Sequence, residues 1–510
     1  MQTPVSNEGK KGKVASHIAN LHTIDGTPWS EKVAAEILRH FKLASETVPA
    51  YRAFLADNHI DPASIHTTKD ICNIPSVSKQ NYLRAYPWED LCTEGSLSND
   101  SLVLTATSGS TGQPSYIPRK DDIHEASSIF FEHFVRHSQL DPKKRTLVVV
   151  CFGMGVWIGG LLTYESFRRA SARGWPLTLI TPGVNKKEVF DALKNIGPSY
   201  DQLILCGYPP FVKDTLDESV HHNIDWERWD MRIMCAAESF SESFRDYLMK
   251  KTGIQNPYRG VANIYGLAEL GTIAIETPLS ILLRRLAINN PALYTILFHD
   301  AGRLPTLAQY IPELTACEMS KDDIVYATGG TAMPLVRYDT GDHGGIFDLA
   351  DARRKCAEAG VDLSAEIDRA GIADTISDLP FIYIYERADL SAKLYGAIIY
   401  PEHIKRGLQR PELESHITGR FTMTTEHDEQ ENEYLEVNIE LLHGITDGEV
   451  IRDTLVKNIV EHLCASSSEY QNNHANMHER VYPRIVFWPH EHHTYFHPGG
   501  KQKWVIHAKK

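Results

Sequence analysis

The chain has 510 residues, of which 42% are hydrophobic and 23% charged, and its formal net charge is −14. This length allows more than one domain with large buried cores, and the acidic balance argues against nucleic-acid binding through phosphate neutralisation. We expect a cytoplasmic protein, because no signal peptide is visible, the apolar stretch 151–164 is too short for a bilayer, and the eight cysteines form no Cys-x-x-Cys pair.

The first predicted element is a helix over residues 30–44, where Val33, Ile37 and Phe41 recur at helical spacing. For residues 71–89 we expect a loop and a short helix. From residue 146, continuous apolar runs alternate with helical stretches, one of them at residues 186–195. The predicted strands cover residues 146–152, 177–181, 203–207 and 231–236. Continuous apolar runs are typical of strands buried on both faces, so the alternation of such runs with helical stretches predicts a parallel α/β sheet.

The C-terminal part has a different pattern, which predicts a small α+β unit. Residues 421–441 alternate like two strands around a polar turn, a helix is expected at 447–464, and a last strand at 484–488. A helical insertion is expected around 350–370. The boundary near 385–396 would divide the chain into a large N-terminal domain, residues 1–386, with mixed or parallel sheets and helices, and a small mobile domain, residues 387–510.

The segment "LTATSGSTGQP" (104–114) is rich in hydroxyls and glycine. Gly109 and Gly112 permit backbone N–H groups to turn inward, and Ser108, Ser110 and Thr111 can donate to oxyanions, as a phosphate cradle requires. The Walker pattern is absent, and a plain surface turn is the alternative.

Two further segments can carry chemistry. In "NIYGLAELG" (263–271), Tyr265 can stack on a base and Glu269 can hold a magnesium ion; the alternative is a strand end with a solvated glutamate. In "MPLVRYDTGDHGG" (333–345), Asp339 and Asp342 flank a tight turn where a carboxylate can accept from both ribose hydroxyls; the alternative is an ordinary Asx turn.

Together, the order and spacing of these segments resemble the adenylate-forming superfamily of acyl-CoA synthetases, and most closely its phenylacetate–CoA ligase branch. "SGSTGQP" is similar to the phosphate loop, "YGLAE" to the Tyr-Gly-x-Thr-Glu motif, and "VRYDTGD" to the Arg-Tyr-x-Thr-Gly-Asp motif. "CAAESFSES" (235–243) resembles the segment lining the adenine site, at Ala237 and Glu238. It also reads as a helix start, with Ser239 as the cap and Glu242 completing a capping box. The resemblance spans about residues 30–506.

The C-terminal part resembles the same family at two further places. Residues 386–404 are similar to its hinge segment, which implies that Arg387 contacts ribose or phosphate, that Asp389 is the pivot, and that Gly396 approaches pantetheine. "HPGGKQKW" (497–504) is similar to the terminal Gly-Lys motif, which implies that Lys501 is the lysine that acts in adenylation. Lys503 is the alternative if the motif is aligned two residues later.

The sequence departs from the family pattern at three positions. Ala268 replaces the usual threonine, Ser115 stands where many relatives carry lysine, and Trp504 replaces the usual arginine. These changes affect rate and register more than the class of reaction.

The resemblance implies ATP-dependent activation of a carboxylic acid, aryl or arylacetic, to an acyl adenylate, followed by transfer to CoA. ATP, Mg²⁺ and CoA would be required, and a homodimer is possible by analogy. The catalytic residues implied are Lys501, Arg387 and Glu269, the last also as metal ligand. The nucleotide and CoA residues implied are Ser108, Gly109, Ser110, Thr111, Gly112, Ala237, Glu238, Asn263, Ile264, Tyr265, Gly266, Asp342, Arg387, Lys393 and Gly396. The alternatives are an amide synthetase, a carrier-protein acyl ligase, or a non-catalytic nucleotide-binding relative.

Two rival hypotheses are weaker. "CFGMGVWIGG" (151–160) is one residue too long for a dinucleotide fingerprint and lacks the acidic residue after the next strand. The resemblance implies instead that this stretch borders the acyl pocket, with Trp157 helping to set its shape. A metal site among the C-terminal histidines lacks a cysteine or well-placed carboxylate, and Asn-rich surroundings disfavour a helix there; solvated or interface histidines are expected. These histidines are His474, His478, His490, His492, His493 and His497.

Overall fold

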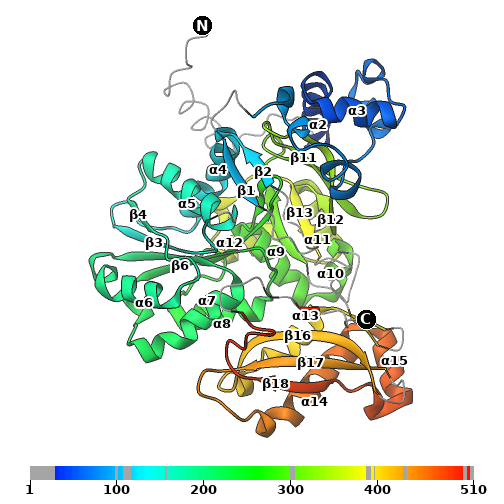
Figure 1. The fold of residues 1–510 in the computed structure, drawn as a ribbon. Helices are drawn as coiled ribbons and strands as arrows, with labels where there is room; N and C mark the ends of the chain where they lie inside the picture. The colour runs from blue at the N-terminus through cyan, green and yellow to red at the C-terminus, as the bar shows by residue number, and fades with distance from the viewer. Residues whose placement is uncertain are drawn as a thin grey trace.

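The computed structural model describes residues 29–97, 102–106, 116–155, 158–298, 305–385, 392–394, 397–428, 433–497, 502, 504 and 505. Figure 1 shows three regions: helices at the N-terminal end, a large sheet flanked by helices, and a C-terminal segment beneath them. We use "C-terminal segment" for the described residues from 392 to 505. The large sheet has the strand order β10-β11-β12-β13-β9-β8-β7-β6-β5-β3-β4.

One half of the large sheet is parallel, as the alternating pattern predicts. Its strands are β3 (Thr146–Cys151), β4 (Leu177–Ile180), β5 (Gln202–Gly207), β6 (Asp230–Ala236) and β7 (Val261–Leu267). Every residue of β3 and β5 is buried, because helices cover both faces. The helices that connect these strands are α5 (Ile158–Ala172), α6 (Lys186–Asn195), α7 (Pro209–Glu218) and α8 (Glu242–Thr252).

The other half of the sheet is antiparallel and begins where β7 pairs with β8 (Gly271–Ile275). The remaining strands are β9 (Thr306–Tyr310), β10 (Ala316–Met319), β11 (Ile324–Gly329), β12 (Leu335–Phe347) and β13 (Phe381–Ile384). The helices of this half are α9 (Pro278–Asn289), α10 (Pro291–Phe298), α11 (Leu349–Glu358) and α12 (Leu363–Ala370). The β7–β8 turn, which contains Glu269, therefore lies at the junction of the two halves.

The N-terminal region packs against the antiparallel half. Helix α2 (Trp29–Thr47) confirms the first predicted element, and α3 (Pro49–Asp57) and short helical turns follow it. The N–H of Val77 donates to the carbonyl of Arg337 at 3.3 Å, and the N–H of Asp339 donates back to Val77 at 2.8 Å. This bridge fixes the next residues beside β12. The hairpin β1 (Val103–Ala106) and β2 (Tyr116–Arg119) then leads into α4 (Asp121–His137).

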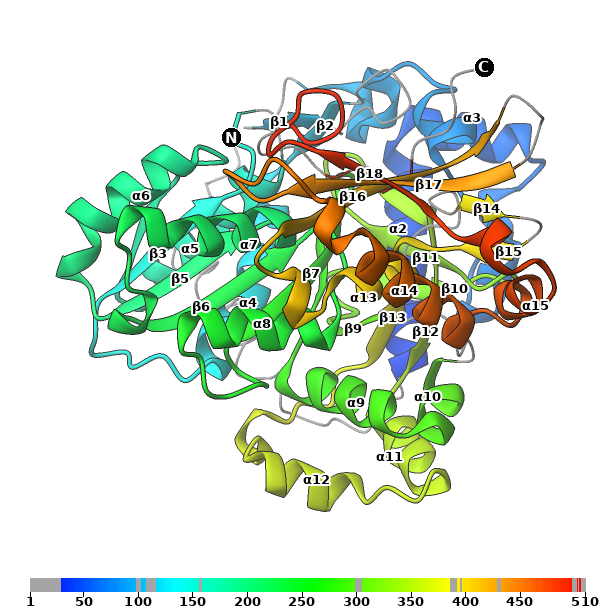
Figure 2. The ribbon, with the colours of Figure 1, turned by 90° about the horizontal axis from the view of Figure 1, so that it is seen from below.

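The C-terminal segment has a hydrophobic core of its own, which shares no residue with the other four buried clusters. Its strands are β14 (Ala392–Leu394), β15 (Ala397–Ile399), β16 (Ile417–His427), β17 (Glu433–Leu441) and β18 (Arg484–Trp488). Its helices are α13 (Pro401–Leu408), α14 (Glu449–Ser466) and α15 (Ser468–Met477). Figure 2, seen from below, shows β16–β18, α13 and α14 in front of the large sheet.

One expectation for this segment is wrong: His474 lies in helix α15 despite its Asn-rich surroundings. The side chain of Ser467 caps the helix by accepting from the N–H of Tyr470 at 3.2 Å. Tyr470 is buried and donates its hydroxyl to the carbonyl of Val481 at 2.8 Å. Tertiary packing thus outweighs the weak local preference.

Among the described residues, no helix combines the length and the apolar character needed to cross a membrane.

Candidate functional site

The β1–β2 hairpin holds the two ends of the hydroxyl-rich loop together. Thr105 pairs with Ile117 and Ala106 with Tyr116, so residues 107–115 connect two adjacent strand ends. The loop itself, with Ser108, Gly109, Ser110, Thr111 and Gly112, lies outside the described residues.

Arg119 ties this hairpin to the β7–β8 turn. Its Nε donates to the hydroxyl of Thr105 at 2.9 Å, and its Nη2 donates to the carbonyl oxygen of Ala268. Arg119 is 1% exposed, and burial lowers the pKa of its guanidinium to about 10, while Glu269 acts in the opposite direction. Sequence reasoning missed this residue, although it stands close after the loop. The base of the predicted phosphate loop is therefore anchored next to Glu269.

Glu269 is buried and faces a cation, so its interpretation as a solvated glutamate is wrong. Its side chain is 3% exposed, and the ammonium of Lys79 lies 2.9 Å from its Oε1. Lys79 begins the short helical segment η3 (Lys79–Leu83), directly after the bridge between Val77 and β12. Sequence reasoning missed Lys79 as a partner, because its contact depends on that distant bridge. Two basic groups, Lys79 and Arg119, thus surround this turn.

Tyr265 and Asp342 meet across the sheet from β7 and β12. The Tyr265 hydroxyl donates to Oδ2 of Asp342 at 2.8 Å. Burial, together with the Asp342 carboxylate, raises the pKa of Tyr265 well above its usual value. The N–H of Gly341 donates to Oδ1 of Asp339 at 2.8 Å, so the Asx turn is present, but Asp342 is oriented by a tertiary contact.

The turn after Tyr265 requires glycine. A Cβ on Gly266 would lie 2.6 Å from the carbonyl oxygen of Gly271, closer than a carbon atom can approach. Gly266 therefore allows β7 and β8 to approach closely, with Tyr265 on β7 and Glu269 in the turn that joins the two strands.

The end of β6 lies beside the start of this site. Asn263 and Ile264 on β7 pair with Cys235 and Ala236 on β6. Ala237 follows with φ 74°, a left-handed conformation that is uncommon for a residue with a Cβ. The Asn263 amide donates to the carbonyl of Glu238 at 2.9 Å, which fixes this turn against β7.

The predicted cap of the following helix is wrong by two residues. The side chain of Ser241, rather than Ser239, accepts from the N–H of Phe244 at 3.1 Å. Glu242 is the first residue of α8 and does not complete a capping box with Ser239. Its carboxylate instead belongs to a buried ion network.

This network joins α8, α9 and the segment after β8. Glu242 accepts from Arg245 and Arg284, each at 2.8 Å, and Arg245 also donates to Glu276 at 2.8 Å. Burial alone would raise the pKa of Glu242, but Arg245 and Arg284 lower it to about 2. The N–H of Asn263 donates to Glu276 at 2.9 Å, so the network also holds β7. Arg285 also lies 2.8 Å from Glu242 and pairs with Asp246, so the positive and negative charges stay equal in number. We call Glu242, Glu276, Arg245 and Arg284 the balanced cluster.

A pocket separates this region from the C-terminal segment. Glu238, Phe240 and Tyr247 line one side, while Gln409 and Trp504 line the other. The hydroxyl of Ser241 donates to Oε1 of Gln409 at 2.5 Å across the boundary.

Several predicted residues lie outside the described part of the chain: Arg387, Asp389, Gly396, Lys501, Lys503 and Trp157. Lys393 lies on β14, where it pairs with Ile398 in the backbone register. Of the predicted nucleotide residues, the structure brings Tyr265 to Asp342 and Asn263 to Glu238.

Known proteins resemble this chain in its overall fold and, over part of its length, in its sequence. No family model matches the chain. Phenylacetate-coenzyme A ligase of Thermus thermophilus is 23% identical over 228 residues, 44% of this chain and 47% of that protein. The match thus spans about half the length of the curated relative.

Two solved structures of 2-hydroxyisobutyryl-CoA ligase cover 96% of this chain. The structure in the postadenylation state with R3-HIB-AMP has a TM-score of 0.65, 13% identity and 92% coverage of its own chain. The structure with 2-HIB-AMP and CoA in the thioesterification state has a TM-score of 0.53, 12% identity and 91% coverage. The predicted resemblance is therefore confirmed for the fold by the CoA-ligase structures, and for the phenylacetate–CoA ligase branch by a partial sequence match.

Proposed function

We propose that this protein is an AMP-forming acid–thiol ligase. In the first half-reaction a carboxylate oxygen attacks the α-phosphorus of ATP, which gives an acyl adenylate and releases pyrophosphate. In the second, the thiol of CoA attacks the acyl carbon, which forms a thioester and releases AMP and a proton. The first step is needed because a free carboxylate has no adequate leaving group.

The observation that carries this proposal is that three of the predicted motifs approach one another at the junction of the two sheet halves. The base of the hydroxyl-rich loop is tied by Arg119 to the carbonyl of Ala268, and the next residue, Glu269, faces Lys79 at 2.9 Å. On the same strand, β7, Tyr265 reaches Asp342. A polyanion and an adenosine group would thus find basic, aromatic and acidic groups on adjacent elements.

Each group has a role that follows from its chemistry. The N–H groups and hydroxyls of residues 108–112 would receive phosphate oxygens, and Lys79 and Arg119 would offset their charge. Asp342 would accept from ribose hydroxyls, and Tyr265, with Ala237 and Glu238 opposite, would border the base. Because Arg119, Tyr265 and Asp342 are held by contacts within the fold before the substrate arrives, they would act by positioning and electrostatics.

Mg²⁺ suits the carboxylate of Glu269. Its Oε1 already attracts the ammonium of Lys79, and carboxylate oxygen is the ligand type that this hard cation prefers. When bound, Mg²⁺ would neutralise phosphate charge.

The proposal includes a mobile small domain of residues 387–510 on a large domain of residues 1–386. Asp389 would be the pivot, Arg387 would contact the nucleotide, Lys501 would enter for adenylation, and Lys393 and Gly396 would face the site for thioester formation. The separate hydrophobic core of the C-terminal segment supports this division. The higher TM-score to the postadenylation state than to the thioesterification state supports an arrangement like that of the postadenylation state.

The acid we propose is aryl or arylacetic, and the acceptor is CoA. The partial match to phenylacetate-coenzyme A ligase supports both. An amine or a carrier-protein thiol would use the same adenylate, so the acceptor needs its own measurement.

The deciding experiment is ATP–pyrophosphate exchange with a panel of carboxylic acids. We expect acid-dependent exchange in the wild type, its loss in Lys501→Ala, and its retention in the matched control Lys503→Ala. CoA, then amines, would be added with the accepted acid, and the acyl product identified by mass spectrometry. If ATP binds but no acid in a broad panel supports exchange, the protein is a nucleotide-binding relative without ligase activity and the proposal is wrong.

A further inference from the structure

Seven titratable or basic side chains meet where the large sheet's helices face the C-terminal segment. They come from α6 and α7 on one side, and from β16, β17 and the turn after β18 on the other. We call this group the boundary cluster: Lys186, Asp214, Glu218, Arg420, Glu440, His490 and Glu491.

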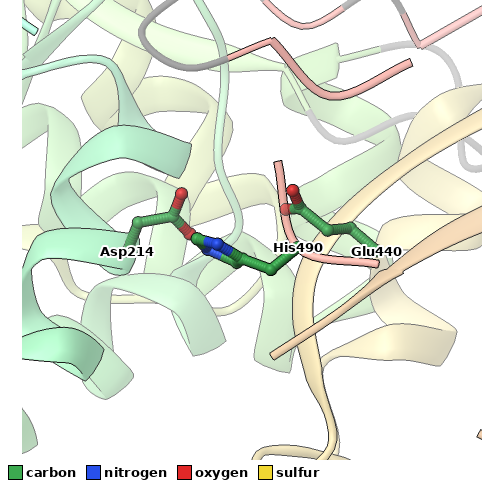
Figure 3. A group of neighbouring side chains, drawn as sticks. All are labelled: Asp214, Glu440 and His490. Carbon is green, nitrogen blue, oxygen red and sulfur yellow. The ribbon is translucent and has the colours of Figure 1, made fainter. Parts of the chain in front are cut away.

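Three members of this cluster have the spacing of metal ligands. One ligand atom each from Asp214, Glu440 and His490 lies within 4.8 Å of the other two. Figure 3 shows the imidazole of His490 against the carboxylate of Asp214, with the carboxylate of Glu440 close by. The sequence offered His490 no well-placed carboxylate, because Asp214 and Glu440 approach it only through the tertiary fold.

The cations of the cluster are already engaged. The ammonium of Lys186 lies 2.6 Å from Glu218 and 2.9 Å from Glu491, but 3.7 Å from Asp214. Arg420 contacts Glu440 at 3.3 Å and is 4.0 Å from Asp214. It also donates to the carbonyl of His497 at 3.0 Å. Lys213, next to Asp214 on α7, is paired with Asp217 at 2.6 Å.

The boundary cluster therefore has more negative than positive charge. Asp214, Glu218, Glu440 and Glu491 are four carboxylates, whereas Lys186 and Arg420 supply two positive charges. The side chain of Asp214 is 5% exposed, and its Oδ1 has no hydrogen-bond partner among the described residues. Buried charges need compensation, and a divalent cation would compensate Asp214 and Glu440 in their ionised forms.

Burial changes the pKa of all three side chains. It raises the pKa of Asp214 and raises that of Glu440 to about 7, so binding of a metal ion by these carboxyls would release protons. Burial also lowers the pKa of His490, which keeps its imidazole neutral and able to donate a lone pair at neutral pH.

We propose that Asp214, Glu440 and His490 bind one divalent transition-metal ion, which links α7 to the C-terminal segment. One imidazole nitrogen and two carboxylate oxygens, with water in a remaining position, suit Zn²⁺. This site is separate from Glu269, and it does not depend on the proposed ligase activity.

The test uses the full chain after treatment with a chelator, titrated with Zn²⁺ at pH 7.5 without ATP and followed by calorimetry and by competition with a chromophoric chelator. We expect one ion per chain. Asp214→Asn and His490→Gln should each weaken binding by more than the roughly 10–100-fold that is lost when a residue hydrogen-bonded to a metal ligand is removed. His493→Gln, an exposed neighbour of His490, and Glu269→Gln should leave affinity unchanged.

Two independent measurements keep the outcome clear. Thermal unfolding of each metal-free variant shows whether it folds, and Co²⁺ substitution should give a visible absorption band that His490→Gln removes. The proposal is overturned if no stoichiometric ion binds, or if binding survives in both cluster variants. It is also overturned if His493→Gln weakens binding as much as His490→Gln, because a surface histidine site would then explain it.

Discussion

The balanced cluster and the boundary cluster both bury charged side chains, and they differ in what compensates the carboxylates. In the balanced cluster Glu242 and Glu276 face Arg245 and Arg284, and the pKa of Glu242 falls to about 2. In the boundary cluster the carboxylates outnumber the cations, and the pKa of Glu440 rises to about 7. Two buried glutamates of one chain thus shift in opposite directions. Burial raises the pKa of both carboxyls, and the number of cations in contact decides whether that rise is overcome, as at Glu242, or persists, as at Glu440.

The largest expected effect comes from unbalancing the first cluster. Glu242→Gln leaves Arg245 and Arg284 short of one negative charge in a buried place, which should reduce the free energy of unfolding by about 3–5 kcal/mol. Chemical denaturation measures this. The control is Glu449→Gln, which removes a solvent-exposed partner of Arg452 and should change stability little. Equal losses in the two variants would contradict the distinction between the clusters.

Glu269 lies between these extremes, since it is buried but its partner Lys79 is 37% exposed. Glu269→Gln should therefore change the unfolding temperature little, while lowering the rate of acid-dependent pyrophosphate exchange by about 10²–10³-fold. Exchange at saturating ATP and acid, beside thermal unfolding, separates the two effects. Glu366→Gln, on the peripheral helix α12, should change neither. Full exchange activity in Glu269→Gln would show that this carboxylate takes no part in adenylation.

The pH dependence of stability should have opposite signs in the two clusters. Glu242 stabilises the fold above its ordinary pKa of 4.5, and this contribution is lost as pH falls toward 2. Glu440 has a raised pKa, so its contribution is complete below pH 4.5 and is lost as pH rises to about 7.

Comparison of wild type with Glu440→Gln tests the second sign. In metal-free protein, the variant should gain stability relative to the wild type between pH 4.5 and 7, by at most about 1.4 kcal/mol per pH unit. The difference should level off above pH 7. Denaturant unfolding across this range measures it, and a difference independent of pH would show that Glu440 is ionised throughout.

The smallest effect concerns the serine that precedes the balanced cluster. Ser241→Ala removes both the cap of α8 and the bond to Gln409, and should cost about 1 kcal/mol. Ser239→Ala, the matched control two residues earlier, should cost less. Denaturant unfolding distinguishes the two variants. A larger loss in the free energy of unfolding for Ser239→Ala would favour Ser239 as the helix cap, as the sequence predicted.

The sequence predicts elements whose pattern is local. Helix α6 coincides with the predicted residues 186–195, and β3 and β5 follow from continuous apolar runs buried on both faces. The motif carrying Tyr265 and Glu269 is also legible, because a tight reversal needs glycine at 266. The side-chain partners of these residues cannot be predicted from the sequence in the same way. Lys79 contacts Glu269, beside the bridge between Val77 and β12, and Asp214 approaches His490, only in the tertiary fold.

The bond from Arg119 to residue 268 is made to a main-chain carbonyl, and this has a consequence for how the protein can diverge. A side chain at that position can be exchanged without breaking the tie, which accounts for alanine standing where the family pattern has threonine. The constraint there falls on the course of the backbone and not on the residue type. Substitutions at residue 268 can therefore accumulate while the course of the turn persists.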